Sequence, residues 1–148
     1  MPYHKEQQFS PYTPQQLFDL VADVEKYPKF LPWCKSARII QQEADGFTAE
    51  LTISFAHISE SYISRVVLIP PQDGAVAEII VSMVKGPFEY LINNWKFTQI
   101  NGGTRIDFVL DFKFKSRILE KLIGSLFGKA TAKMVSAFKQ RAITLYGI

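Results

Sequence analysis

Residues 105–127 read RIDFVLDFKFKSRILEKLIGSLF, and the change of hydrophobic period within them decides the fold. Up to Phe114, apolar residues alternate with polar ones, which is typical of a strand with one buried face. From Ser116 to Tyr146, apolar residues instead recur every three or four positions, which predicts one amphipathic helix with a single apolar stripe. A helix of about 31 residues is about 46 Å long, enough to cover a whole sheet. The stripe and the apolar face of the sheet would therefore cover each other.

The chain before this helix carries turn signals with alternating segments between them. Asp-Gly at 45–46 and 73–74 and Asn-Gly-Gly at 101–103 tolerate the positive φ of tight hairpin turns, and Gly-Pro at 86–87 marks a further turn. Between these turns apolar and polar residues alternate, as expected of an antiparallel meander. We predict about six strands here and one earlier strand near residues 3–9.

A short helix is predicted to begin at Thr13. Thr13 is the N-cap, Pro14 takes the first helical position, and Gln16 completes a capping box. The elements together predict an α+β fold: a seven-stranded antiparallel sheet, short helices after the first strand, and a long C-terminal helix. No linker or repeat divides the 148 residues, so we expect a single domain over 1–148.

The composition points to a large aromatic core or a lined pocket. The chain has twelve Phe, six Tyr and two Trp, and its hydrophobic share is 47%. Its single cysteine, Cys34, excludes an internal disulfide and a multi-cysteine metal site. We expect neither a secretory signal nor a membrane span, because no run approaches roughly 18 apolar residues.

The C-terminal segment is basic. From residue 113 to the end there are eight Lys or Arg residues against one acid, Glu120. This bias suggests an anionic lipid or a nucleic acid as partner, although a solvated helix face would have the same composition. The candidate residues for contact with a membrane or RNA are Lys121, Lys129, Lys133 and Lys139.

Residues 27–34, YPKFLPWC, combine two prolines with large apolar side chains. Proline disfavours helix interiors and central strands, so we predict a loop. Large apolar groups on a loop gain most by packing inward. They would either close the mouth of an apolar cavity or form a plain hydrophobic plug.

Several stretches resemble the coenzyme Q-binding START family over nearly the whole chain. They are residues 27–34, Gly86-Pro87-Phe88, Asn94-Trp95 with Phe97, Phe108-x-Leu110-x-Phe112, and Met134 with Phe138 and Arg141. The resemblance implies the helix-grip fold, in which a curved sheet wraps around the long helix and leaves an apolar cavity. It also implies binding of ubiquinone (coenzyme Q), or a similar isoprenoid lipid, in support of respiration. The family also includes a bacterial ribosome-association toxin, which implies instead binding to the large ribosomal subunit and a block of subunit association.

Large apolar side chains from the loop, the strands and the helix stripe are the candidate ligand-binding residues. They are Tyr27, Phe30, Leu31, Trp33, Phe55, Phe88, Trp95, Phe97, Phe112, Leu122, Leu126, Ala130, Met134 and Phe138. The small side chain of Ala130 would either let the helix approach closely or leave room for the ligand.

We expect no catalytic residues, no catalytic cofactor and no metal. His4 and His57 lack partners at metal-ligand spacing, and the predicted inward positions are almost wholly apolar. The glycines and lysine at 124–129 are one residue short of a P-loop and lie in a predicted helix.

Two hypotheses remain open from the sequence. In the first, the cavity carries the quinone and the lysines hold the domain at an anionic membrane. In the second, the same basic helix binds ribosomal RNA phosphates. We expect a bacterial cytoplasmic protein, peripheral to the inner membrane under the first hypothesis, or a mitochondrial matrix protein if the chain is a trimmed eukaryotic one.

Overall fold

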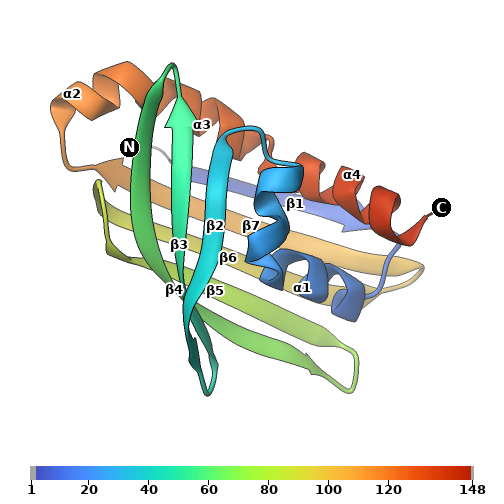
Figure 1. Cartoon of the computed structure of the whole chain (residues 1–148). Coiled ribbons are helices and arrows are strands. Elements are labelled where there is room, and N and C mark those ends of the chain that lie inside the picture. Colours follow the sequence, from blue (N-terminus) through green and yellow to red (C-terminus); the bar gives the residue numbers. More distant parts are fainter. Residues whose placement is uncertain (1–2, 148) are drawn as a thin grey trace.

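A computed structural model describes residues 3–147 and shows a curved antiparallel sheet with helices on its concave side (Figure 1). The strands are β1 (Tyr3–Ser10), β2 (Cys34–Glu43), β3 (Gly46–Phe55), β4 (Ile58–Gln72), β5 (Val76–Lys85), β6 (Phe88–Ile100) and β7 (Gly103–Phe114). Their order in the sheet is β1-β7-β6-β5-β4-β3-β2. The predicted seven-stranded antiparallel helix-grip arrangement is confirmed.

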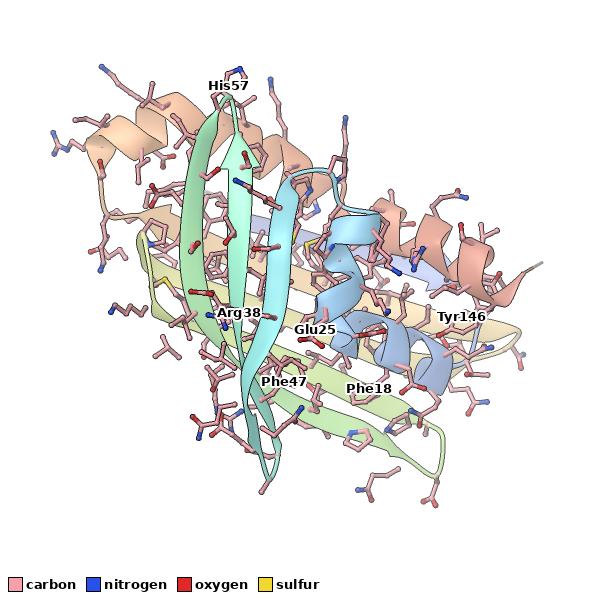
Figure 2. The ribbon with its side chains drawn as sticks, in the orientation of Figure 1. Phe18, Glu25, Arg38, Phe47, His57 and Tyr146 are labelled. Carbon is pink, nitrogen blue, oxygen red and sulfur yellow. The ribbon has the colours of Figure 1, made fainter. Side chains whose placement is uncertain are left out.

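Hairpin turns join β2 through β7, and all but one were visible in the sequence. The exception is the turn between β3 and β4, where Ala56 and His57 adopt positive φ values of 49° and 68°. Figure 2 shows His57 at the tip of this turn. Neither residue type signals a turn strongly, so this turn is set by the pairing of its two flanking strands. Phe55 pairs with Ile58 across it.

The helix α1 (Pro14–Ala22) begins as predicted. The Thr13 side chain accepts a hydrogen bond from the Gln16 backbone N–H, and the Gln16 side chain accepts one from the Thr13 backbone. Its apolar face is buried, including Leu17 and Phe18. This helix covers part of the hollow formed by β4, β5 and β6.

The segment 27–34 is a loop only in its second half. Residues up to Lys29 belong to a short 3₁₀ helix, η1 (Val24–Lys29), which contains Pro28. So short a helix has few internal hydrogen bonds for Pro28 to remove. The Tyr27 hydroxyl donates to the Val21 carbonyl oxygen and ties η1 to α1.

The predicted long C-terminal helical segment is present, but it is not one continuous α-helix. The structure has α2 (Arg117–Leu119), a π-helical turn η2 (Glu120–Gly124), α3 (Ser125–Ala132) and α4 (Met134–Tyr146). The break falls at Lys133, whose φ of −100° and ψ of 5° are not helical. Just before it, the Thr131 hydroxyl donates to the Phe127 carbonyl oxygen, a contact that tends to bend helices.

The core fills most of the space between the sheet and these helices. Its largest buried side chains include Trp95, Phe97, Phe108 and Phe127. No helix within residues 3–147 combines the length and apolar character that a membrane span requires.

Candidate functional site

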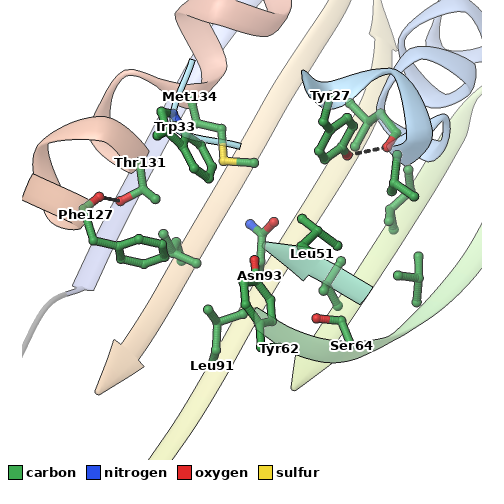
Figure 3. Close-up of a pocket in the computed structure, with 16 residues that line it drawn as sticks. Tyr27, Trp33, Leu51, Tyr62, Ser64, Leu91, Asn93, Phe127, Thr131 and Met134 are labelled. Atoms are coloured by element: carbon green, nitrogen blue, oxygen red, sulfur yellow. Dashed lines mark hydrogen bonds between the residues drawn. The ribbon is translucent and has the colours of Figure 1, made fainter. Parts of the chain in front are cut away.

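A small cavity remains between the concave sheet face and the helical layer (Figure 3). It offers about 50 Å³ to the centres of water molecules. This is room for a few water molecules. Ligand sites usually measure about 300–1,000 Å³, so a larger molecule could enter only if the wall moves.

The cavity wall comes from five strands, four helical elements and the loop that carries Trp33. On the sheet side it is lined by Leu51, Tyr62, Ser64, Val66, Ile79, Val81, Leu91, Asn93 and Leu110. On the helical side it is lined by Val21, Val24, Tyr27, Trp33, Phe127, Thr131 and Met134. All of these residues are uncharged, and most are apolar.

Three polar side chains from the sheet interrupt this apolar wall. Asn93 is held from two sides: its Nδ2 donates to the Val109 carbonyl oxygen (3.0 Å), and its Oδ1 accepts from Trp95 Nε1 (3.2 Å). Tyr62 and Ser64 reach the cavity from β4. Burial raises the pKa of Tyr62, so its hydroxyl stays protonated and can donate a hydrogen bond.

Among the predicted ligand-binding residues, the structure brings Tyr27, Trp33 and Met134 to the cavity. Trp33 lies in the loop after η1 and is only half-buried. It stands 6.2 Å from Phe127, measured between ring centroids, and so joins the loop to α3. Trp33 therefore places one residue of this loop in the cavity wall.

Most of the other predicted residues pack in the core beside the cavity. Phe55, Phe88 and Phe112 surround the Phe127 ring, with a centroid distance of 4.6 Å to Phe112. A second cluster joins Phe30 and Trp95 to Phe138, each at 5.0 Å. The residues that pack away from the cavity are Phe30, Leu31, Phe55, Phe88, Trp95, Phe97, Phe112 and Phe138, and Ala130 is half-buried outside the wall.

Leu122 and Leu126 are not brought to the cavity at all. They are 54% and 39% exposed, whereas their neighbours Ile123 and Phe127 are 0% and 2% exposed. The segment carries two apolar rows, and within each row the residues recur every four positions. In the sequence the two rows together resemble one broad apolar stripe. After the π turn only the row containing Ile123 and Phe127 faces the sheet.

Sequence reasoning missed most of the lining residues, including apolar ones such as Leu51, Ile79 and Phe127. The missed polar residues of the sheet are Tyr62, Ser64 and Asn93. Alternation along 60–66 could have placed Tyr62 and Ser64 on the inner face, and Asn93 visibly shares a face with Leu91 and Trp95. The search for large apolar side chains passed over them.

Three of the four predicted contact lysines are exposed. Lys121 and Lys129 lie on the helical segment after β7, and Lys133 lies at the break between α3 and α4. Lys139 is half-buried, and its Nζ donates to Gln8 Oε1 at 3.2 Å, which ties α4 to β1. We call the exposed three, Lys121, Lys129 and Lys133, the basic face.

The fold agrees with comparisons to known proteins. Residues 10–139 match a family described as polyketide cyclase / dehydrase and lipid transport. The chain belongs to this family. A START superfamily protein from Mycobacterium smegmatis, 18% identical, covers 97% of this chain and 98% of its own with a TM-score of 0.75, which supports the fold alone.

More similar relatives carry functional names. Ribosome association toxin RatA of Rickettsia prowazekii is 46% identical over 132 residues, covering 89% of this chain and 90% of that protein. The mitochondrial coenzyme Q-binding protein COQ10 of Drosophila melanogaster is 31% identical over 139 residues, covering 87% of this chain but 53% of that protein. The solution structure of the 18 kDa protein CC1736 from Caulobacter crescentus is 36% identical, covers 100% of both chains and has a TM-score of 0.75. The predicted resemblance is confirmed at the level of the family.

Proposed function

We propose that this chain is a non-catalytic, ribosome-associating protein of the RatA type that acts in the bacterial cytoplasm. The observation that carries the proposal is the 46% identity to Ribosome association toxin RatA along almost the full length of both chains. The expected target is the large ribosomal subunit. Binding of this protein to it would block association of the two ribosomal subunits. An uncharged cavity wall supports a binding role over a catalytic one.

The basic face is the proposed contact surface. Lys121, Lys129 and Lys133 are all exposed, and all three follow β7, where acids are scarce. Lysines that bind RNA phosphates displace the counterions condensed on the RNA. The affinity would therefore fall steeply as the salt concentration rises.

The test is sedimentation with purified large subunits at rising salt. A triple variant, Lys121→Glu, Lys129→Glu and Lys133→Glu, should co-sediment more weakly, and the slope of log affinity against log salt should become shallower by about 2 to 3. The matched control changes three exposed lysines away from this face to glutamate: Lys26, Lys35 and Lys85. Equal loss in both variants would show that only net charge matters. Failure of the unaltered protein to sediment with large subunits at low salt, or binding to anionic vesicles instead, would overturn the proposal.

A second candidate function, binding of an isoprenoid quinone or similar apolar ligand, is favoured by the cavity. Its wall is mainly apolar, and a 31% identical relative is named a coenzyme Q-binding protein. Because the cavity is small, the ligand would have to displace mobile wall groups such as Met134, whose unbranched side chain repacks readily. Solvent extraction of the purified protein, followed by mass spectrometry, tests this. Extracts without isoprenoid lipid, even after quinone is supplied during expression, would remove this function.

A further inference from the structure

Ser64 is a buried hydroxyl group with an unmet hydrogen bond. The residue is 1% exposed, and within residues 3–147 its Oγ has no hydrogen-bond partner. Three other buried polar atoms share this state in the described chain, on Asn94, Thr98 and Arg141. None of those three residues lines the cavity, whereas Ser64 does. Since buried hydroxyls are normally paired, the Ser64 hydroxyl is free for a group inside the cavity.

Two further polar side chains that line the cavity lie on the same concave face as Ser64. Tyr62 precedes it by two positions on β4, and Asn93 lies on β6, beyond the intervening strand β5. Figure 3 shows Tyr62 and Asn93 directed toward the same part of the cavity. Asn93 already makes two hydrogen bonds, to Val109 and from Trp95, but its amide retains one N–H and one lone pair.

The surroundings restrict the charge of any polar group that enters. The described residues lining the cavity are all neutral, so a carboxylate or phosphate there would be a buried charge without a counterion. A neutral oxygen has no such penalty. A carbonyl oxygen can accept from the Ser64 or Tyr62 hydroxyl, and a ligand hydroxyl can both donate and accept.

We propose that Ser64, Tyr62 and Asn93 form a polar subsite that receives an uncharged carbonyl or hydroxyl oxygen of an otherwise apolar ligand. This inference rests on the second candidate function, in which the cavity holds an apolar molecule. The ligand's apolar body would extend toward the helical side of the wall, past Trp33. Trp33 is the half-buried lining residue on that side, and it sits on a loop.

The test compares two serine-to-alanine variants on neighbouring strands. Ser64→Ala removes the subsite hydroxyl, and Ser82→Ala removes an exposed hydroxyl from β5 as the matched control. Calorimetric titrations use three probes with the same ten-carbon chain: a decyl-substituted benzoquinone, decylbenzene and decanoate. They differ in the head group: a ring with neutral carbonyl oxygens, a ring without oxygen, and a carboxylate without a ring.

The quinone should bind the unaltered protein and Ser82→Ala equally. Ser64→Ala should weaken quinone binding about three- to tenfold, the range for losing one hydrogen bond, and should leave decylbenzene binding unchanged. Tyr62→Phe, which keeps the ring, should also weaken the quinone alone. The Ser64→Ala protein should melt no lower than the unaltered protein, because it loses an unpaired buried hydroxyl, and this keeps misfolding from mimicking the effect.

Each contrary result has a distinct meaning. Equal weakening of quinone and decylbenzene, or no weakening of either, would overturn the subsite while the cavity function stands. Decanoate binding as tightly as the quinone would overturn the requirement for a neutral group. If none of the probes binds the unaltered protein, the cavity function and the subsite both fail.

Discussion

Replacing Ile123 and Leu122 by alanine, one at a time, tests which apolar row of the C-terminal segment faces the sheet. The two residues are neighbours of equal volume in the π turn η2. Ile123 is 0% exposed and Leu122 is 54% exposed. The substitution removes the same number of carbon atoms at both positions, so only their location differs.

The expected losses of stability differ several-fold. At a fully buried site, Ile→Ala costs about 2–5 kcal/mol, because transfer energy is lost and a cavity remains. At the exposed site, Leu→Ala should change the free energy of unfolding by about 0.5 kcal/mol or less. A 3 kcal/mol loss at an assumed slope of about 2 kcal/mol/M lowers the urea midpoint by roughly 1.5 M.

Urea unfolding followed by far-ultraviolet circular dichroism measures both variants against the unaltered protein. The slopes should agree among the three proteins, so that the midpoints report stability alone. Equal losses of unfolding free energy for Leu122→Ala and Ile123→Ala would instead support the single broad apolar stripe predicted from the sequence. A larger loss at Leu122 would refute the orientation of the helix after the π turn.

Two further predictions concern Cys34 and the glycines. Burial raises the pKa of the Cys34 thiol from 9.0 to about 11. At pH 8 a disulfide reagent should therefore label it about 100-fold more slowly than an ordinary thiol, while urea restores the rate; equal rates with and without urea would contradict this. Gly46→Ala should destabilise the protein by about 1–3 kcal/mol, because its Cβ would lie 1.9 Å from the Val66 carbonyl oxygen. Gly128→Ala, with nothing within 4 Å of its Cβ, should stabilise α3 by about 0.5–1 kcal/mol, and thermal melts that gave both variants the same sign would refute this contrast.

The cavity was harder to predict than the fold. Alternation along a strand identifies the inward face, but every inward residue then looks like a candidate for the wall. Phe112 and Leu110 both point inward from β7, yet Leu110 lines the cavity and Phe112 packs against Phe127. The difference depends on sheet curvature and on side chains arriving from α3, which no local pattern records.

The sequence by itself determined the strands, their buried faces, most of the turns and the Thr13 cap. Each of these depends on residues within about four positions of one another, so backbone sterics and periodicity suffice. Only the tertiary structure decided where the last helix breaks, which of its apolar rows is buried, and that Ser64 lines the cavity. These features depend on how side chains from segments far apart in the chain pack into the same interior space. That packing is defined only in the folded chain.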